Sequence, residues 1–146
     1  SYLPVEVLTL KHFPQIGDIP ETGSTLLENA FIKAETVYRE TGIPSLADDT
    51  GLEIKALGGE PGVFSARYAG EQATFDDNCN KVLSKLTQTG TSDRSACFRT
   101  VIAFVNAGKN NSPSVRFMIL GLVKSIFWSA VLIPLSFKLS RPKRVI

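Results

Sequence analysis

The sequence contains a single histidine and only two cysteines among its 146 residues. The histidine, His12, has no serine, cysteine or acid at a spacing that would form a catalytic triad, and one histidine cannot supply an HExxH zinc motif. We interpret His12 as an ordinary residue of the surface or of the rim of a site. If the protein is an enzyme, its chemistry must depend on carboxylates, lysines and a hard metal ion.

The chain also lacks a disulfide pattern and a strong charge. Cys79 falls in a helix-like stretch and Cys97 in a strand-like one, without CxxC spacing, which favours two reduced thiols. The first residues do not have the pattern of a signal peptide. A net charge of +2 is too small to indicate nucleic-acid binding. These observations favour a cytoplasmic protein with no nucleic-acid partner.

Two capping boxes predict two helices. The first, at Thr25 and Glu28, begins a helix from about residue 26 to Thr41, and Gly42 ends this helix. The second capping box begins at Thr74. The predicted apolar stripe of the second helix comprises Phe75, Val82, Leu83 and Leu86.

Strand patterns alternate with these helices. Runs of apolar residues or alternating polarity predict strands over residues 2–10, 44–47, 52–57, 94–108 and 115–123. Turn-forming residues predict a loop over Pro14–Thr25, a glycine-rich loop over Gly58–Gly70 with an exposed Arg67, and a hairpin over Asn106–Ser114. The order of elements predicts a mixed α/β domain.

The segment SLADDTGLE places Asp48 and Asp49 side by side after a predicted strand. A turn needs only one aspartate side chain to form a hydrogen bond with its backbone, and a second aspartate adds like-charge repulsion. Glu21 precedes the first helix and Lys33 lies on its second turn, while Ser24–Glu28 would present N–H groups suited to phosphate. Carboxylates without histidine or cysteine suit Mg²⁺, which usually also binds substrate phosphates.

Each of these features also has an ordinary structural interpretation. An Asp-Asp-Thr-Gly segment is more often a solvated turn than a metal site when no other motif supports it. Glu28 is equally well explained as the acid of the capping box. Local sequence leaves both alternatives open.

Two longer segments carry a resemblance. ETGSTLLENAFIKA, followed by ADDTGLEIKALGGEPGVFSARYAG, closely resembles the inosine triphosphate pyrophosphatase family. The family pattern runs E-T-G-x-T-x-x-E-N-A, then A-D-D-[ST]-G-L, then L-G-G-x-P-G-[VI]-[YF]-S-A-R-Y, and RSACFRTVIAF fits the next strand of the family. The resemblance covers roughly residues 1–117.

This resemblance implies a fold and an activity. The implied fold is a single, truncated α/β domain with a mixed, elongated sheet flanked by helices. The implied activity is Mg²⁺-dependent hydrolysis of ITP, dITP and XTP to monophosphate and pyrophosphate, which removes deaminated purines from the nucleotide pool. The implied partners are a purine nucleoside triphosphate and a second copy of the chain in a homodimer.

The resemblance also implies roles for individual residues. Asp49 matches the acid that acts as general base and metal ligand. The other implied metal ligands are Glu21 and Asp48, the second of which also shapes the local field. The implied substrate-binding residues are Thr50, Lys33 and Arg67.

Parts of the family pattern are absent from this sequence. The chain begins after the family's T-x-N-x-x-K phosphate loop, and it contains neither G-F-G-Y-D-P nor S-H-R, which read the base. Loss of such transition-state contacts commonly costs about 3–4 kcal/mol each. We therefore expect this chain to be a poor catalyst. Two alternatives stay open: a Maf-like nucleotide pyrophosphatase, and a catalytically dead homologue that only dimerises.

The last part of the chain has no match to the family. We expect a pyrophosphatase-like domain over residues 1–126 and a divergent tail over 127–146. A shifted reading frame or mis-joined exon, a divergent but real C-terminal half, and a membrane anchor over Phe117–Phe137 are the three interpretations. Lys124 and Pro134 argue against the anchor, so we do not expect membrane association.

Overall fold

The structure is a computed structural model that describes residues 6–108 and 113–122. These residues divide into two compact units. Unit 1 comprises residues 6–49, 101–108 and 113–118, and unit 2 comprises residues 50–100 and 119–122.

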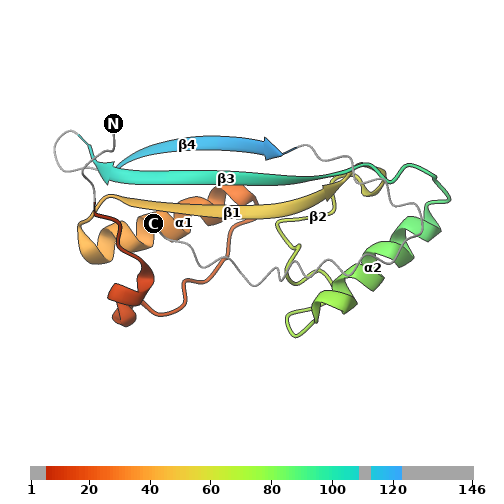
Figure 1. The fold of residues 1–146 in the computed structure, drawn as a ribbon, viewed down its shortest axis with the longest axis horizontal. Helices are drawn as coiled ribbons and strands as arrows, with labels where there is room; N and C mark the ends of the chain where they lie inside the picture. The colour runs from red at the N-terminus through yellow and green to blue at the C-terminus, as the bar shows by residue number, and fades with distance from the viewer. Residues whose placement is uncertain (1–5, 109–112, 123–146) are drawn as a thin grey trace. The chain divides into compact units, whose positions relative to one another are not determined.

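One antiparallel sheet supplies the strands, in the order β2-β1-β3-β4 (Figure 1). The strands are β1 (Ser45–Ile54), β2 (Pro61–Gly62), β3 (Ala96–Ala107) and β4 (Pro113–Leu122). β1 pairs antiparallel with β2 through Leu52 opposite Gly62. Together with helices α1 (Leu26–Thr41) and α2 (Phe75–Gln88), this sheet confirms the predicted α/β fold class.

Capping residues at its two ends fix where helix α1 begins and ends, as the sequence predicts. The hydroxyl of Thr25 accepts a hydrogen bond from the backbone N–H of Glu28 at 3.1 Å. At the other end, Gly42 has a φ of 69°, a left-handed conformation that glycine adopts without strain, and its N–H donates to Tyr38 at 2.8 Å. The bounds of this helix therefore follow from local chemistry.

Small side chains form the core of unit 1. On α1 the buried apolar residues are Leu26, Ala30, Ala34 and Val37, at helical spacing. Figure 1 shows α1 lying along β1, and Ala47 of that strand is fully buried, as are Ala103 and Val105 of β3. Fully buried alanines on both a helix and a strand favour a close approach between the two backbones. Side-chain bonds from Asn29 and Lys33 on the helix to Asp49 on the strand join the two elements at the acid pair.

The predicted strand over residues 2–10 is wrong in the described part. Residues 6–9 form no strand, and the short 3₁₀ helices η1 (Leu10–His12) and η2 (Pro14–Ile16) follow. The backbone N–H of Thr9 donates to Nδ1 of His12 at 3.1 Å, and the N–H of His12 donates back to Thr9 O at 2.9 Å. These local bonds replace the ladder bonds that a strand would need.

The break predicted at the acid pair between two short strands is also wrong. They are one continuous strand, β1, and only Lys55–Leu57 beyond it form a 3₁₀ turn, η3. Asp48 and Asp49 therefore lie inside a strand and not in a turn. Pairing in the sheet overrides the turn preference of the Asp-Asp-Thr-Gly segment, because strand propensity depends strongly on context.

Helix α2 begins as predicted, but only Leu86 of its predicted apolar stripe is buried. Thr74 and Asp77 form the capping box. Of the predicted stripe, Leu86 is buried, whereas Phe75 is 50% exposed and Leu83 is 44% exposed. Polar contacts hold this helix instead, since Lys81 donates to the carbonyl of Tyr68 at 2.5 Å.

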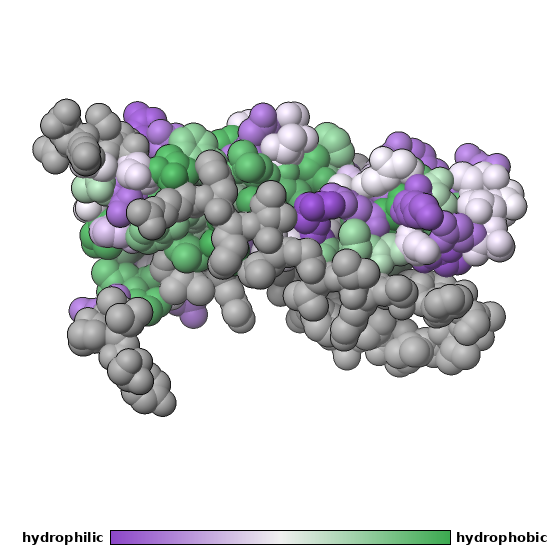
Figure 2. Space-filling view, turned by 90° about the horizontal axis from the view of Figure 1, so that it is seen from above, coloured by the Kyte–Doolittle hydropathy of each residue, from purple (hydrophilic) through white to green (hydrophobic). Residues whose placement is uncertain are grey.

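Apolar side chains reach the surface in several places among the described residues. Figure 2 shows such side chains in green beside polar ones in purple. The large exposed examples are Val7, Leu27, Ile43, Phe64, Phe75 and Leu83. Single exposures of this kind are normal for folded proteins, so we assign them no role.

The apolar run considered as a membrane anchor begins inside β4. Residues 117–122 belong to that strand, and the rest of the run lies outside the described residues. Among residues 6–108 and 113–122, no helix has the length and apolar character needed to cross a membrane. The predicted boundary at residue 126 also lies outside the described residues and stays a prediction.

Candidate active site

Three predicted site residues meet in unit 1. The ammonium nitrogen of Lys33 lies 2.8 Å from Oδ1 of Asp49 and 3.3 Å from Oε1 of Glu21. The side chains of Lys33 and Asp49 are 14% and 11% exposed, and that of Glu21 is 35% exposed. Oxygen atoms from two distant parts of the sequence thus converge on one positive atom.

Three elements supply these side chains. Lys33 comes from the second turn of α1, and Glu21 comes from the loop before that helix. Along β1, burial alternates residue by residue, with Ala47 and Asp49 buried and their neighbours less so. This alternation is the two-residue period of a strand, and it places Asp49 on the same side as the buried Ala47.

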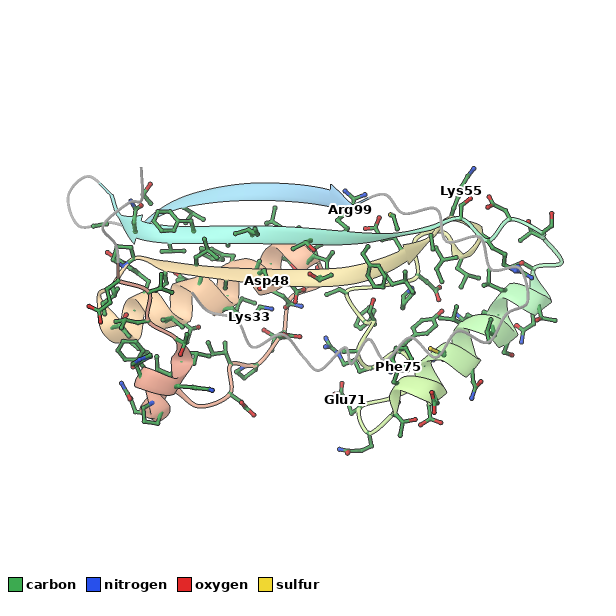
Figure 3. All side chains as sticks on the ribbon, viewed as in Figure 1. Lys33, Asp48, Lys55, Glu71, Phe75 and Arg99 are labelled. Atoms are coloured by element: carbon green, nitrogen blue, oxygen red, sulfur yellow. The ribbon has the colours of Figure 1, made fainter. Side chains whose placement is uncertain are left out.

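Asp48 therefore points to the other side of β1. It is half-buried, and Figure 3 labels it together with Lys33. Within the described part of the chain, no group of three or more acids, histidines or cysteines is arranged to hold a metal ion. The geometry thus separates Asp48 from the Glu21–Asp49 pair and favours an influence through its charge rather than through coordination.

Asn29 is a site residue that the sequence analysis missed. Its side chain is fully buried. Its Oδ1 accepts a hydrogen bond from the backbone N–H of Gly23 at 2.7 Å, and its Nδ2 donates to Oδ2 of Asp49 at 3.5 Å. One amide thus connects the loop that carries Glu21 to the strand that carries Asp49. A polar residue within the buried stripe of α1 was the signal that could have identified it.

Gly23 is packed against this amide. A Cβ atom at position 23 would lie 2.6 Å from Oδ1 of Asn29 and 2.7 Å from Cβ of Glu28. Both distances are far below van der Waals contact. The loop can therefore approach α1 this closely only because residue 23 is glycine.

Glu28 has the ordinary structural role. Its carboxylate accepts hydrogen bonds from the backbone N–H of Ser24 at 2.6 Å and from the Ser24 hydroxyl at 2.7 Å. These two bonds lower the pKa of Glu28. The predicted phosphate-binding N–H groups at this helix start are thus partly used, because the chain's own acid takes the N–H of Ser24.

Burial raises the pKa of the Asp49 carboxyl. The hydrogen bond and the positive charge of Lys33 act in the opposite direction, and the negative charge of Glu21 raises the pKa further. A carboxylate with a raised pKa is a better proton acceptor than an exposed one. The environment of Asp49 thus suits the role of general base.

Thr50 and Arg67 belong to unit 2. The hydroxyl of Thr50 lies 2.9 Å from that of Thr100 on β3. Arg67 lies 5.5 Å above the ring of Phe64 and 3.5 Å from Oε1 of Glu71. Its side chain is only 18% exposed, so the prediction of an exposed arginine is wrong, because the ring and the acid cover it.

The residues around Lys33 fit the implied Mg²⁺. This ion takes oxygen ligands and is commonly held by one or two carboxylates together with substrate phosphates. The two acid oxygens that already lie within 3.3 Å of one positive nitrogen provide such a pair. Glu21 and Asp49 are the residues that would hold the ion.

Two acid side chains thus converge on one lysine in an α/β fold. The sequence profile of the Ham1 family matches residues 1–122. The chain belongs to the Ham1 family.

Relatives with known sequences or structures agree with this assignment. The chain is 48% identical over 112 residues to a dITP/XTP pyrophosphatase of Coxiella burnetii, a match that covers 74% of this chain and 56% of the relative. It is 49% identical over 111 residues to a dITP/XTP pyrophosphatase of Flavobacterium johnsoniae, covering 75% and 57%.

Two solved structures are similar in fold. A HAM1 protein from Coxiella burnetii gives a TM-score of 0.69 at 44% identity, over 82% of this chain and 60% of that one. A dITP/XTP pyrophosphatase from Mycobacterium abscessus gives 0.66 at 31% identity, over 83% and 62%. The chain spans a little over half the length of the curated relatives it matches.

Proposed function

We propose that this chain carries the metal and base residues of a nucleoside triphosphate pyrophosphatase. Its substrates would be ITP, dITP and XTP, and its products the monophosphate and pyrophosphate. This proposal rests on one observation: the side chains of Glu21 and Asp49 converge on Lys33, within the part of the chain that matches the Ham1 family. The names of the relatives, dITP/XTP pyrophosphatase, support the choice of substrate.

Asp49 would act as general base in the attack of water on the α-phosphorus. Such a base must lie within hydrogen-bond reach of the water, and burial raises the pKa of Asp49 toward the range in which a carboxylate accepts a proton well. Asn29 would hold the second oxygen of this carboxylate, leaving Oδ1 directed at the ligand side where Lys33 now lies. The fixed orientation matters because the rate of proton transfer depends on geometry first.

The remaining residues would bind the substrate and the cofactor. Mg²⁺ bound by Glu21 and Asp49 would supply neutralisation of phosphate charge and polarisation of the attacked phosphoryl group. Lys33 would contact the phosphates, and the family resemblance assigns further substrate contacts to Thr50 and Arg67. Asp48 would adjust the electrostatic potential from the other side of β1.

We also propose the cellular setting implied by the family resemblance. The protein would act in the cytoplasm as a homodimer, and it would remove deaminated purine nucleotides from the pool. Two reduced cysteines, both half-buried in the structure, support a reducing compartment.

Pyrophosphate release in single turnover, with the chain in excess over nucleotide, tests this function. We expect release from ITP, dITP and XTP in Mg²⁺, much slower release from ATP, and loss of release in Asp49→Asn. Asp93→Asn is the matched control, because Asp93 contacts Lys55 and not Lys33. Equal rates with ATP and ITP, or a rate unchanged in Asp49→Asn, would contradict the proposal. Comparison with a full-length relative tests the expectation that this chain is a poor catalyst.

A further inference from the structure

Lys33 is the positive partner of both acids at once. Its ammonium lies within hydrogen-bond distance of Asp49 and within ion-pair distance of Glu21, and its side chain is largely buried. The position between the two acid oxygens is therefore taken by a charge that belongs to the protein. This is the position in which a metal ion would find both carboxylates.

The two acids need this charge when nothing else is bound. Asp49 is 8% exposed, and a buried carboxylate without a positive partner is strongly unfavourable. Glu21 adds a second negative charge whose effect on Asp49 is repulsive. Lys33 offsets both effects, so it stabilises the acids at close range before any ligand arrives.

A divalent cation cannot share these oxygens with the ammonium at its present distances. Two cations on the same pair of oxygen atoms would repel each other strongly in a site that is partly closed to water. A lysine can leave such a position, because its four-carbon stem has several rotatable bonds and its ammonium is a compact charge. A bound nucleotide would offer phosphate oxygens as new partners for it.

We propose that Lys33 is an internal counter-ion, which occupies the metal position between Glu21 and Asp49 in the nucleotide-free protein and is displaced when metal binds. The site therefore binds free metal weakly and binds metal together with a phosphate ligand strongly. The first half of this inference concerns the acids and Lys33 alone. The second half depends on the proposed function, because the phosphate ligand is the proposed substrate.

Binding of Mn²⁺ to the nucleotide-free chain, measured by electron paramagnetic resonance, tests the first half. Lys33→Met keeps an apolar stem but removes the competing charge, so we expect Mn²⁺ to bind about tenfold more tightly than to the wild-type chain, a usual effect for one close charge pair. An affinity that is unchanged or weaker in Lys33→Met overturns the inference.

Two further variants separate the counter-ion from general charge effects. Lys33→Arg keeps the positive charge and should leave Mn²⁺ affinity near the wild-type value. Lys55→Met removes the same net charge, but Lys55 contacts Asp93 rather than the two acids, so it should also leave the affinity unchanged. Tighter binding in all three variants would contradict a role specific to the Lys33 charge.

A measurement on the wild-type chain covers the case in which Lys33→Met does not fold. In nuclear magnetic resonance spectra that detect lysine ammonium groups, the Lys33 signal should be protected from exchange with water when no metal is present. Saturation with Mg²⁺ and a non-hydrolysable ITP analogue should remove the scalar coupling that a direct hydrogen bond gives between Nζ of Lys33 and the carboxyl carbon of Asp49. A coupling that persists at saturation overturns the inference.

These results are independent of catalysis. Tighter Mn²⁺ binding in Lys33→Met without any pyrophosphate release from ITP by the wild-type chain would support the counter-ion and contradict the proposed function. Pyrophosphate release with unchanged Mn²⁺ affinity in Lys33→Met would support the function and overturn the counter-ion.

Discussion

Asn29 and Asp49 are linked in the interior of unit 1, where the buried amide of the first donates to a carboxylate oxygen of the second. The two residues are 20 positions apart in the sequence, on a helix and on a strand. The same amide accepts a bond from the loop that carries Glu21. Asn29 is thus a positioning residue for both proposed metal ligands.

The first prediction concerns the role of Asn29 in orienting the site. Asn29→Ala should lower kcat by about 10–100-fold with a smaller effect on KM, because second-layer partners of metal ligands typically have effects of this size. It should also cost about 1–3 kcal/mol of stability, since the bond to Gly23 is lost. Steady-state kinetics and urea unfolding check these values.

Asn29→Asp is the informative companion variant. It keeps an acceptor for the Gly23 N–H but places another negative charge beside Asp49, in addition to that of Glu21. A like charge raises the pKa of Asp49 further, so the acid limb of the pH–rate profile should move to higher pH. An unchanged pH profile in Asn29→Asp, together with full activity in Asn29→Ala, would contradict a positioning role.

The second prediction concerns the close approach at Gly23. Gly23→Ala should cost about 1–3 kcal/mol and also lower activity, because the added methyl would displace the Asn29 amide. Gly42→Ala is the control: it is strained by its φ of 69° but has no atom within 4 Å of the new Cβ. We expect about 1 kcal/mol of destabilisation there, with activity retained. Equal losses of activity in both variants would argue against the specific contact.

The third prediction concerns the stability cost of the buried acid. Because burial raises the folded-state pKa of Asp49, the charged form is disfavoured in the folded protein. This cost is absent below the ordinary value of 3.8, grows as pH rises and is fully present above the folded-state pKa. Asp49→Asn should therefore raise Tm at pH 7 relative to wild type, with a smaller gain near pH 4.

Asp93→Asn should have the opposite effect. Hydrogen bonds from Ser95 lower the pKa of Asp93, so its charge stabilises the folded state above the unfolded-state pKa, and this contribution is lost as pH falls through the folded-state pKa. Asp93→Asn should thus lower Tm at pH 7 and have less effect in acid. Thermal unfolding of both variants at the two pH values provides the check, and a shift of the same sign in both at pH 7 would refute the assignment.

The fourth prediction concerns the contact between α2 and the loop that carries Arg67. Oδ1 of Asn78 accepts a hydrogen bond from the backbone N–H of Ala69 at 2.7 Å, and its Nδ2 donates to Ala66 O at 3.2 Å. Asn78→Ala should therefore speed hydrogen exchange of the Ala69 amide by about tenfold, which corresponds to loss of one net hydrogen bond. Asn80→Ala, on the exposed side of the same helix, should leave this exchange rate unchanged.

Local signals allowed the helices to be predicted, and non-local pairing explains the main errors. The capping residues Thr25 and Thr74 fix the starts of α1 and α2 through bonds within one turn, which sequence alone can indicate. The continuity of β1 depends on neighbouring strands from other parts of the chain, so the turn-like Asp-Asp-Thr-Gly segment gave the wrong expectation.

The meeting of three candidate site residues also follows from the motifs. Shared motifs singled out Glu21, Lys33 and Asp49, and the structure brings their side chains together, while their roles stay predictions. The position of Asn29 within the apolar stripe signalled a buried polar group, but its partners, the Gly23 N–H and Asp49, are known only once the fold is known. For the same reason, the sequence could not indicate that Lys33 would lie between the acids rather than beside them.

Because β1 is an uninterrupted strand, the carboxylates of Asp48 and Asp49 lie in different environments although they are chemically identical. Odd-numbered positions from Ser45 to Gly51 point inward, so Asp49 enters the interior while Asp48 does not. A slip of one residue in the pairing would exchange them and still present an aspartate to Lys33, but it would also bring Leu46 into the place of Ala47. The alternation of side chains along the strand therefore determines which of the two carboxylates faces Lys33. The chemical identity of the side chains does not, because both are aspartates.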